Sequence, residues 1–495
     1  MKIIRPLLVF ILCAGAAFAQ PENSGLALAL VFTDHMVLQR NKPLQIYGRA
    51  GAGEAVQVRL QGQSREAVAD GEGKWKVVLP AQKAGGPYEL TVSGRQGKVV
   101  VRDVLIGDVW LCSGQSNMDF QLKDAQTGPE ELAKGQFNPH IRLLKYRGSV
   151  PWGDVSWDSA TLARVNRFDF FKGEWKTPDA GSAASFSAVA YYFGQKIAAT
   201  ENVPIGLIQV AVGGSPTESW IDETVLRGDD RFAGLLTNWL QSELVMEWCR
   251  HRAGVNVAHG NALRQRHPFQ YGYNYEAGIA PLTDFPIAGV IWYQGESNVH
   301  NVSLHEALFE TLVKSWRQGR GEVFPFYYVQ LSGIDRPNWP EFRDSQRQML
   351  ARIPHAGMAV SYDAGDSLNV HPVRKKEVGE RLALLALRGY YGKPVVAEGP
   401  VAQKATLKNA SILLDFNRDQ KLLTPNNVPL TGFELLTRIG RRVPAQAAIV
   451  KGRVRIAVPE GEAVRTVLYA YQPFTRANLY NEAGLPAPTF SISVD

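Results

Sequence analysis

The sequence predicts an α/β protein in which a domain with a central parallel sheet lies between two antiparallel β modules. At 495 residues the chain is too long for one ordinary core. Short runs of alternating apolar and polar residues fill 20–104, and they return in 396–495. Between them, in 105–395, apolar strands alternate with helical periodicity, which is typical of a three-layer α/β/α domain.

Residues 1–19 have the pattern of a secretory signal peptide. Lys2 and Arg5 give a positive start, an apolar run follows, and Ala17-Phe-Ala19 supplies the small residues that cleavage before Gln20 requires. The apolar run is too short to span a membrane, and no later segment is long enough. We therefore expect cleavage and a secreted or periplasmic protein.

The two flanking modules share one pattern. Runs such as Val56-Gln-Val-Arg-Leu60 and Trp75-Lys-Val-Val-Leu79 in 20–104 are separated by Gly-rich turns, and similar runs recur in 396–495, for example Arg453-Val-Arg-Ile-Ala-Val458. This alternation is typical of strands with one buried face. It predicts a sandwich-like N-terminal domain and a C-terminal β module.

The central region contains apolar strands at 104–111, 205–212, 287–293 and 326–331 and helices at 186–198, 305–316 and 375–387. Continuous apolar strands are typical of a parallel sheet covered on both faces. Two insertions interrupt it, at about 151–180 and 222–275, and a helix is expected over 235–250. Loops of this length in a compact domain are often binding elements.

Four of the segments at strand ends carry residues suited to acyl transfer. Ser116 follows the strand 109–112, Gly214 lies in a Gly-Gly turn after 205–212, Gln294 and Glu296 follow 287–293, and His371 precedes a helix. A lone serine here is more often a helix cap, and a lone histidine is more often structural. Together they supply a nucleophile, two hydrogen-bond donors for an oxyanion and a general base.

The same segments carry a family resemblance. The chain resembles the bacterial sialate O-acetylesterases, which belong to a branch of the SGNH hydrolase superfamily and to the carbohydrate esterases. The resemblance covers nearly the whole mature chain. Its most specific motifs are Gly107-Asp-Val-Trp-Leu-Cys-Ser-Gly-Gln-Ser-Asn-Met118, Trp292-Tyr-Gln-Gly-Glu-Ser-Asn298 and His371-Pro372.

This resemblance implies an SGNH-type hydrolase domain that removes acetyl groups from sugar hydroxyls. Ser116 would attack the acetyl carbonyl, His371 would take its proton, and Gly214 and Gln294 would hold the oxyanion. The implied partner is an O-acetylated sugar or glycan, with sialic acid esters as the first candidate. Neither a metal nor another cofactor is implied.

One position departs from the superfamily pattern, which has an Asp two or three residues before the histidine. Those positions hold Leu368 and Asn369. The residue that orients His371 is therefore open: Glu296 is the first candidate and Asp366 the second. Asn369 as a neutral partner, or a Ser–His dyad, are the remaining alternatives.

Two other functions compete with the first. One is an acetyl esterase for plant polysaccharide such as xylan or xyloglucan, and the other is a catalytically inactive carbohydrate-binding protein. For the polysaccharide esterase, specificity would lie in the insertions. Several tryptophans are candidates for sugar stacking or, more commonly, for the core: Trp152, Trp157, Trp175, Trp220 and Trp239.

Charge and cysteine content exclude few functions. Cleavage removes Lys2 and Arg5, so the net charge falls from +7 to +5, with dispersed charges that give little support to nucleic-acid binding. The mature chain keeps Cys112 and Cys249, neither with metal-site spacing. Cys112 is expected to be a small buried hydrophobe. The sequence leaves the oligomeric state open.

Overall fold

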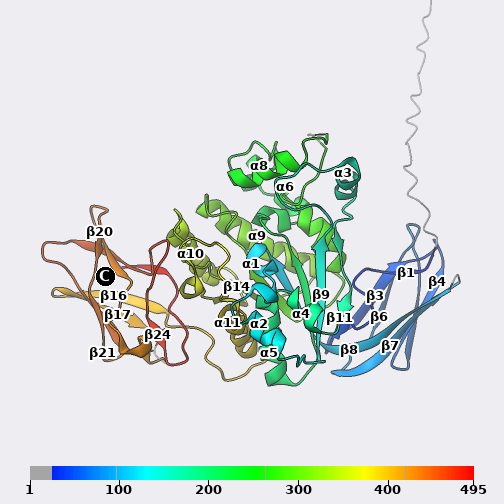
Figure 1. Ribbon diagram of the computed structural model, residues 1–495, viewed down its shortest axis with the longest axis horizontal. Helices are drawn as coiled ribbons and strands as arrows, with labels where there is room; N and C mark the ends of the chain where they lie inside the picture. Colours follow the sequence, from blue (N-terminus) through cyan, green and yellow to red (C-terminus); the bar gives the residue numbers. More distant parts are fainter. Residues whose placement is uncertain (1–24, 96, 262–263, 418–419) are drawn as a thin grey trace, which may run out of the picture.

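The computed structural model describes residues 25–95, 97–261, 264–417 and 420–495, so the expected signal at 1–19 lies outside the described residues. Figure 1 shows an N-terminal β module, a central α/β domain and a C-terminal β module side by side, in the predicted order. The predicted fold class is confirmed.

The N-terminal module contains two groups of strands that share one core. One sheet has the order β1-β3-β6, and the other strands pair as β5-β4-β7-β8. Apolar side chains alternate along the strands, so that Val56, Val58 and Leu60 are buried while the residues between them face outward. The strands that belong wholly to this module are β1 (Ala27–Leu28), β2 (Val37–Gln39), β3 (Leu44–Arg49), β4 (Ala55–Leu60), β5 (Gln63–Val68), β6 (Lys74–Leu79) and β7 (Gly85–Gly94).

Strand β8 (Gly97–Gly114) belongs to both the N-terminal module and the central domain. Its first half pairs antiparallel with β7, and Val37–Gln39 pair with it in parallel at 105–107. Its second half pairs in parallel with β12 and β13. The predicted boundary between 104 and 105 therefore lies within one continuous strand.

In the central sheet, the strands that follow β8 in the chain are added first on one side of β8 and then on its other side. The parallel order is β9-β12-β8-β13-β14-β15, and the short strands β10 and β11 pair antiparallel with β9. Such a reversal leaves a crevice at the carboxyl ends of the strands, where ligands bind. The strands are β9 (Ile141–Gly148), β10 (Phe171–Lys172), β11 (Trp175–Lys176), β12 (Ile205–Ala211), β13 (Gly289–Tyr293), β14 (Phe326–Val329) and β15 (Ala356–Ala359).

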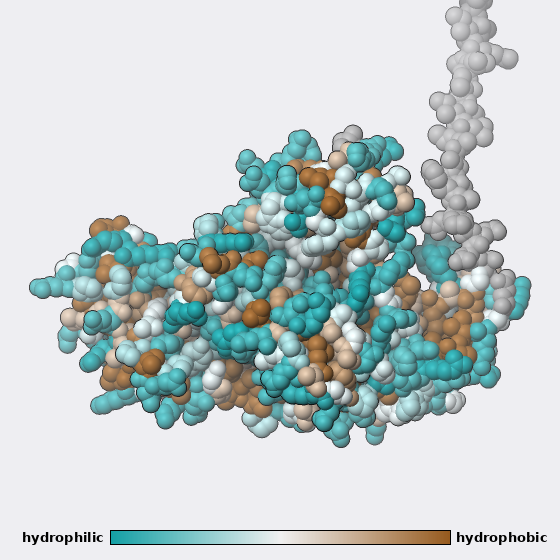
Figure 2. Space-filling model, in the orientation of Figure 1, coloured by the Kyte–Doolittle hydropathy of each residue, from teal (hydrophilic) through white to brown (hydrophobic). Residues whose placement is uncertain are grey.

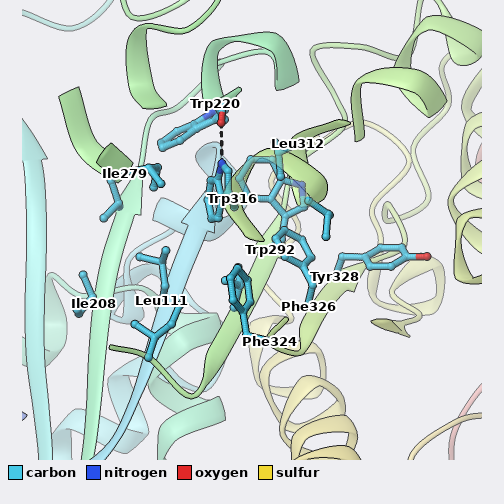
Figure 3. Packing of buried hydrophobic residues seen from close by; sticks show 14 of the residues in the cluster. Leu111, Ile208, Trp220, Ile279, Trp292, Leu312, Trp316, Phe324, Phe326 and Tyr328 are labelled. Atoms are coloured by element: carbon cyan, nitrogen blue, oxygen red, sulfur yellow. Dashed lines mark hydrogen bonds between the residues drawn. The ribbon is translucent and has the colours of Figure 1, made fainter. Parts of the chain in front are cut away.

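Helices cover both faces of this sheet, as the continuous apolar strands predict. Along β8, Trp110 and Cys112 pack in the cluster under α5 and α11, whereas Val109 and Leu111 pack in the other cluster, which includes α9. On the α9 side, Trp292 makes edge-on contacts with Trp220 and Trp316, which Figure 3 shows together with Phe326. The helices are α1 (Ser116–Asp119), α2 (Gly128–Ala133), α3 (Ser159–Asn166), α4 (Ala180–Ala184), α5 (Ala188–Glu201), α6 (Glu223–Arg227), α7 (Ala233–Leu236), α8 (Glu247–Asn256), α9 (Val302–Arg320), α10 (Trp339–Gln348) and α11 (Lys375–Gly389).

The two insertions pack against each other in a lobe that contains α3, α6 and α8 (Figure 1). Asn256 joins them, because its side-chain amide donates to the carbonyls of Gly153 and Val155. The prediction of a single helix over 235–250 is wrong. The chain leaves α7 at Leu236, Asn238 has a φ of 31°, and a new helix starts only at Glu247. This break lets Leu235, Trp239 and Val245 all reach the core.

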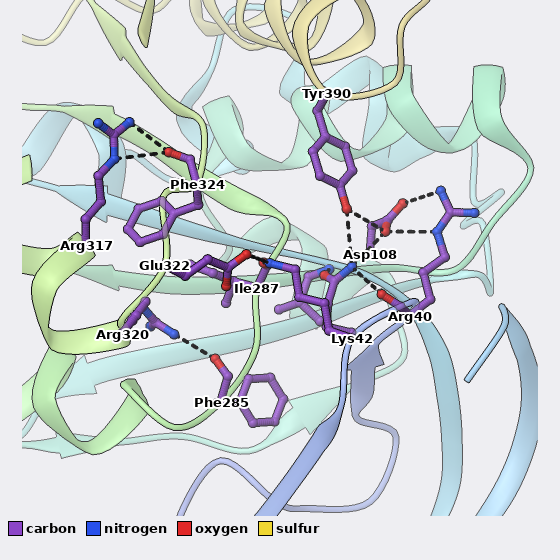
Figure 4. Close-up of polar contacts among 12 residues, drawn as sticks. Arg40, Lys42, Asp108, Phe285, Ile287, Arg317, Arg320, Glu322, Phe324 and Tyr390 are labelled. Atoms are coloured by element: carbon purple, nitrogen blue, oxygen red, sulfur yellow. Dashed lines mark hydrogen bonds and ion pairs between the residues drawn. The ribbon is translucent and has the colours of Figure 1, made fainter. Parts of the chain in front are cut away.

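Polar contacts fix the N-terminal module to the central domain (Figure 4). The Arg40 guanidinium pairs with the buried carboxylate of Asp108 on β8, at 2.8 Å. Lys42 donates to the carbonyl of Ile287 at 2.8 Å and pairs with Glu322. The pair with Asp108 fixes the orientation of the module, since this buried carboxylate would be left uncompensated without Arg40.

The C-terminal module contains two four-stranded antiparallel sheets and a two-stranded one. The buried guanidinium of Arg343 on α10 donates to the carbonyls of Ala470, Gln472 and Pro473, which ties the module to the central domain. Its strands are β16 (Ala402–Lys408), β17 (Ser411–Phe416), β18 (Leu422–Leu423), β19 (Phe433–Thr437), β20 (Arg442–Pro444), β21 (Ala447–Val450), β22 (Arg453–Ala457), β23 (Val464–Tyr469), β24 (Tyr480–Asn481) and β25 (Phe490–Ser493).

The surface is mostly hydrophilic on the face that Figure 2 shows, with hydrophobic residues in separate patches. Within the described ranges, no helix has the length and apolar character needed to cross a membrane. Cys112 and Cys249 are both buried and unbridged, and Cys112 is the buried hydrophobe that its place in the strand predicts.

Candidate active site

Ser116 and His371 form a hydrogen-bonded pair at the carboxyl end of the sheet. Ser116 is the first residue of α1, directly beyond β8, and its hydroxyl oxygen lies 2.8 Å from Nε2 of His371. Both side chains are half-buried. The structure thus joins the two residues that the sequence proposed as nucleophile and base.

The loop before His371 is shaped by its own side chains. Asp366 accepts hydrogen bonds from the backbone N–H groups of Leu368 and Asn369, and these donors lower the pKa of Asp366. Asn369 accepts from the backbone N–H of His371 at 2.9 Å. Asp366 is exposed, and neither Asp366 nor Asn369 has a hydrogen bond to the imidazole in the described part of the chain. Both side chains therefore hold the loop backbone.

The same loop is anchored from two sides at Asp363. Arg381 on α11 forms a two-pronged ion pair with the Asp363 carboxylate at 2.7 Å, and Tyr480 of the C-terminal module donates to it at 3.1 Å. Arg374 donates to the Asp363 carbonyl. Although burial opposes ionisation, the hydrogen bonds from Arg381 help to lower the pKa of Asp363.

Glu296 lies in a buried network beside the Ser–His pair. Asn117, next to Ser116, donates its amide to Glu296 Oε1 and to the carbonyl of Val370, while Lys375 donates to Asn117 Oδ1. Glu296 Oε2 is buried without a hydrogen-bond partner among the described residues. Glu296 therefore reaches the His371 segment through Asn117 and Val370, and no direct hydrogen bond joins it to the imidazole there.

Burial and charge set the protonation of this network. Burial raises the pKa of Glu296 and lowers the pKa of Lys375 to about 7. Burial also lowers the pKa of His371 below its usual 6.5, and the cations Lys375 and Arg336 add to this shift. The imidazole is consequently neutral at pH 7, as a general base must be.

The Gly213–Gly214 turn after β12 borders Ser116. A Cβ at position 213 would lie 2.8 Å from the Trp152 ring and 3.5 Å from the Ser116 Cβ. Gly214 has a φ of 74°, and a Cβ there would lie 2.4 Å from the Trp248 ring. The Gly214 carbonyl accepts from Ser297 Oγ at 3.0 Å. Both glycines are buried, and a side chain at either position would have to displace a tryptophan ring.

Gln294 is buried behind this turn in a network of amides. Its Nε2 donates to Asn298 Oδ1 at 2.7 Å and makes a longer contact of 3.4 Å to the Ser215 carbonyl. Its Oε1 accepts from the hydroxyl of Thr217 at 2.6 Å. The Gln294 amide is thus engaged within the protein, and no hydrogen bond among the described residues joins it to Ser116 or His371.

The tryptophans divide into two groups. Trp152 is 61% exposed and borders Gly213. The other four tryptophans considered from the sequence are buried in the core: Trp157, Trp175, Trp220 and Trp239. Trp248, which the sequence analysis missed, is 37% exposed and borders Gly214.

Asn117 and Lys375 were also missed. Asn117 lies inside the serine motif, and its position next to a possible nucleophile could have indicated a role in the site. Lys375 looks like an ordinary first-turn residue of a helix. Within the ranges the structure describes, no group of three or more His, Cys, Asp or Glu side chains is arranged to hold a metal ion.

Comparison with known proteins places this geometry in context. The model of a family described as carbohydrate esterase, sialic acid-specific acetylesterase, matches residues 106–242 and 255–388. The chain is 30% identical to the sialate O-acetylesterase of Rattus norvegicus over 466 residues, which cover 84% of this chain and 83% of that protein. It is also 30% identical to the sialate O-acetylesterase of Homo sapiens over 438 residues, which cover 80% and 77%.

A solved structure resembles the whole fold. The crystal structure of a carbohydrate acetylesterase from Xanthomonas citri superimposes with a TM-score of 0.78 and 32% sequence identity. The match covers 94% of this chain and 99% of the Xanthomonas citri chain. All three parts of the fold therefore fall almost entirely within the match.

Proposed function

The chain belongs to the sialic acid-specific acetylesterase family of carbohydrate esterases, and on this basis we propose that Ser116 is the nucleophile with which it cleaves acetyl esters. The chain is a carboxylic-ester hydrolase that removes acetyl groups from a carbohydrate. The observation that carries the proposal is the 2.8 Å hydrogen bond between Ser116 Oγ and His371 Nε2.

In the proposed acylation step, His371 Nε2 takes the hydroxyl proton while Ser116 Oγ attacks the acetyl carbonyl carbon. The tetrahedral oxyanion then collapses, the sugar oxygen leaves with the proton from His371, and the acetyl group stays on Ser116. A water molecule, deprotonated by His371, releases acetate and restores the serine. Every proton passes through the same imidazole nitrogen.

The proposed oxyanion donors are the backbone N–H groups of Ser116 and Gly214 and the amide of Gln294. The N–H of Ser116 lies in the first turn of α1, where no helical acceptor exists. Losing one donor of this type costs about 3 kcal/mol of transition-state stabilisation. Because Gln294 is engaged with Asn298, it acts as the third donor and the two backbone groups as the first.

We propose Glu296 as the carboxylate that supports His371, acting through Asn117. Its hydrogen bond to Asn117 fixes the amide that holds the Val370 carbonyl, one residue before the imidazole. Its charge also offsets the Lys375 cation. Asp366 is the alternative carboxylate, and its contacts within its own loop make it the weaker one.

Sialic acid O-acetyl esters are the first substrates to test, since the relatives from Rattus norvegicus and Homo sapiens are sialate O-acetylesterases. A second candidate is acetylated plant polysaccharide such as xylan or xyloglucan. The exposed rings of Trp152 and Trp248 suit this candidate as they suit the first, because both substrates present a sugar ring. An N-terminal signal at 1–19 would bring the enzyme to either substrate outside the cytoplasm.

The test measures acetate released from O-acetylated sialic acid and from acetylated xylan. The natural enzyme should release acetate from at least one, and Ser116→Ala should release none while unfolding at the same denaturant concentration. Mass spectrometry of quenched turnover should find the acetyl group on the peptide with Ser116. Sugar affinity without acetate release would instead support a carbohydrate-binding protein.

A further inference from the structure

Two tryptophans stand apart from the rest of the described chain in their exposure. Trp152 and Trp248 are 61% and 37% exposed, whereas the other nine tryptophans are buried. They come from different insertions, near residue 151 and on α8. Exposed indole rings are uncommon because they leave a large apolar surface in water, so a converging pair indicates a ligand.

Both rings converge on the turn beside Ser116. The six-membered edge of Trp152 faces Gly213, and the corresponding edge of Trp248 faces Gly214. A Cβ at Gly213 would contact Trp152 and Ser116 at once. Both rings therefore contact the turn that borders the proposed nucleophile.

Arg252 joins the two rings into one surface, which we call the Trp152–Arg252–Trp248 platform. Its guanidinium carbon lies 5.8 Å from the centre of the Trp152 ring and 5.4 Å from that of Trp248. Cations at this distance from an indole are attracted to it and fix its orientation. Arg252 Nε also pairs with Asp154 at 2.7 Å, so its charge is balanced within the protein.

The Trp152 side of the platform borders a cavity of about 310 Å³ that is lined by both polar and apolar groups. Trp152 and Gly213 form one side of it, and Asp119, Lys145 and Arg147 lie on others. Asp119 pairs with Lys145 at 2.8 Å. Arg147 is exposed, and its side chain makes no hydrogen bond or ion pair within the described residues. An aromatic wall beside hydroxyl-binding groups is the arrangement that a sugar requires.

We propose that the Trp152–Arg252–Trp248 platform stacks against the pyranose ring that carries the acetyl ester, with the ring's hydroxyl groups facing the neighbouring cavity. Because Asp154 balances Arg252, the platform offers apolar ring surface and not a free cation. It thus selects for a sugar ring rather than for the acetyl group. This inference rests on the proposed function of Ser116.

The experiment compares two esters that differ in the ring. The sugar ester is either O-acetylated sialic acid or acetylated xylo-oligosaccharide, whichever the natural enzyme cleaves faster. The second ester is glycerol triacetate, which has acetyl groups but no ring. The readout is the ratio of kcat/KM for the sugar ester to kcat/KM for glycerol triacetate, so any damage to the Gly213 turn that slows both reactions cancels.

Trp152→Ala should lower this ratio about 10-fold, mainly through KM for the sugar ester. Trp248→Ala should lower it in the same direction, and Trp152→Phe should restore most of it because a ring remains. Ile439→Ala, which removes an exposed hydrophobic side chain in the C-terminal module, is the matched control and should keep the ratio.

An unchanged ratio in Trp152→Ala and Trp248→Ala would overturn the platform. That result differs from failure of the proposed function, in which the natural enzyme cleaves no acetyl ester or Ser116→Ala stays active. A fall in the ratio for Ile439→Ala of the same size would also overturn the assignment, since the effect would not be local.

Discussion

Asn117 donates a hydrogen bond to Glu296, so the residue beside the proposed nucleophile is tied to the carboxylate first expected to serve His371. The same amide holds the Val370 carbonyl at 3.0 Å. Support for the imidazole therefore reaches it through the backbone of its own segment.

Glu296→Gln should reduce kcat for acetyl ester hydrolysis by about 10²-fold, because it removes the charge that offsets Lys375 and loosens Asn117. Asp366→Asn should stay within about 2-fold, since the asparagine amide oxygen can still accept from the backbone N–H groups of Leu368 and Asn369. Initial rates on a soluble acetyl ester compare the two variants. The reverse order would assign the supporting role to Asp366.

Lys375→Met should move the acid limb of the kcat/KM profile to higher pH. The Lys375 cation disfavours a second positive charge nearby and so contributes to the low pKa of His371; without it, the pKa of His371 rises towards 6.5. At pH values below that pKa the base is protonated and the rate falls. A pH–rate profile of the variant measures the shift.

Lys376→Met is the matched control and should leave the acid limb in place, because Lys376 has no part in the network around Asn117. The double variant Glu296→Gln with Lys375→Met keeps the buried charges balanced and guards against a folding defect. An acid limb that does not move in either Lys375 variant would contradict this account of the His371 pKa.

Gly214→Ala should lower kcat/KM by about 10²-fold or more. The added Cβ would lie 2.4 Å from Trp248, and a φ of 74° is unfavourable for alanine, so the proposed oxyanion turn must move. Gly392→Ala provides the comparison, because Gly392 has a φ of 66° but nothing within 4 Å of an added Cβ. It should cost about 1 kcal/mol of stability and no activity. Equal losses of activity in both variants would mean that backbone strain alone is responsible.

Asp363→Asn should lower the free energy of unfolding by about 3 kcal/mol at neutral pH, because it leaves the buried Arg381 without its counterion. The pKa of Asp363 is lowered in the folded protein, so this stabilisation is present above the unfolded pKa and is lost as the pH falls through the folded value. The variant should therefore lose less stability on acidification than the natural protein does. Urea unfolding at neutral and acidic pH measures both effects.

Tyr480→Phe removes only the neutral donor from Asp363 and should cost about 1 kcal/mol. A loss as large as that of Asp363→Asn would show that contact with the C-terminal module, and not the ion pair, secures the loop.

Periodicity predicted the fold class because the buried strands can be recognised in the sequence as apolar runs. The strands 205–212 and 287–293 and the helix 305–316 lie close to β12, β13 and α9 of the structure. The prediction of one helix over 235–250 was wrong because its apolar residues can also be buried by a chain that is broken into separate turns. Leu235, Trp239 and Val245 reach the core from separate turns, which no periodicity in the sequence indicates.

Ser116 and His371 were predictable as a pair because each follows a recognisable motif at a strand end or before a helix. The contacts between these motifs were not predictable. The hydrogen bond between Asn117 and Lys375, for example, depends on the directions of two side chains that are 258 positions apart in the sequence. Trp248 shows the same limit. Its sequence neighbours do not indicate a site, and only the fold brings it to Gly214.

Strand β8 makes the N-terminal module a part of the catalytic domain's own framework. One backbone runs from the hairpin with β7 to the residue before Gln115, so melting of the module would fray the strand that presents Ser116. The two should unfold as a single cooperative unit. A module exchanged at 104/105 would have to rebuild this strand across the junction, because β7 pairs with residues 97–106 whereas β12 pairs with residues 108–114.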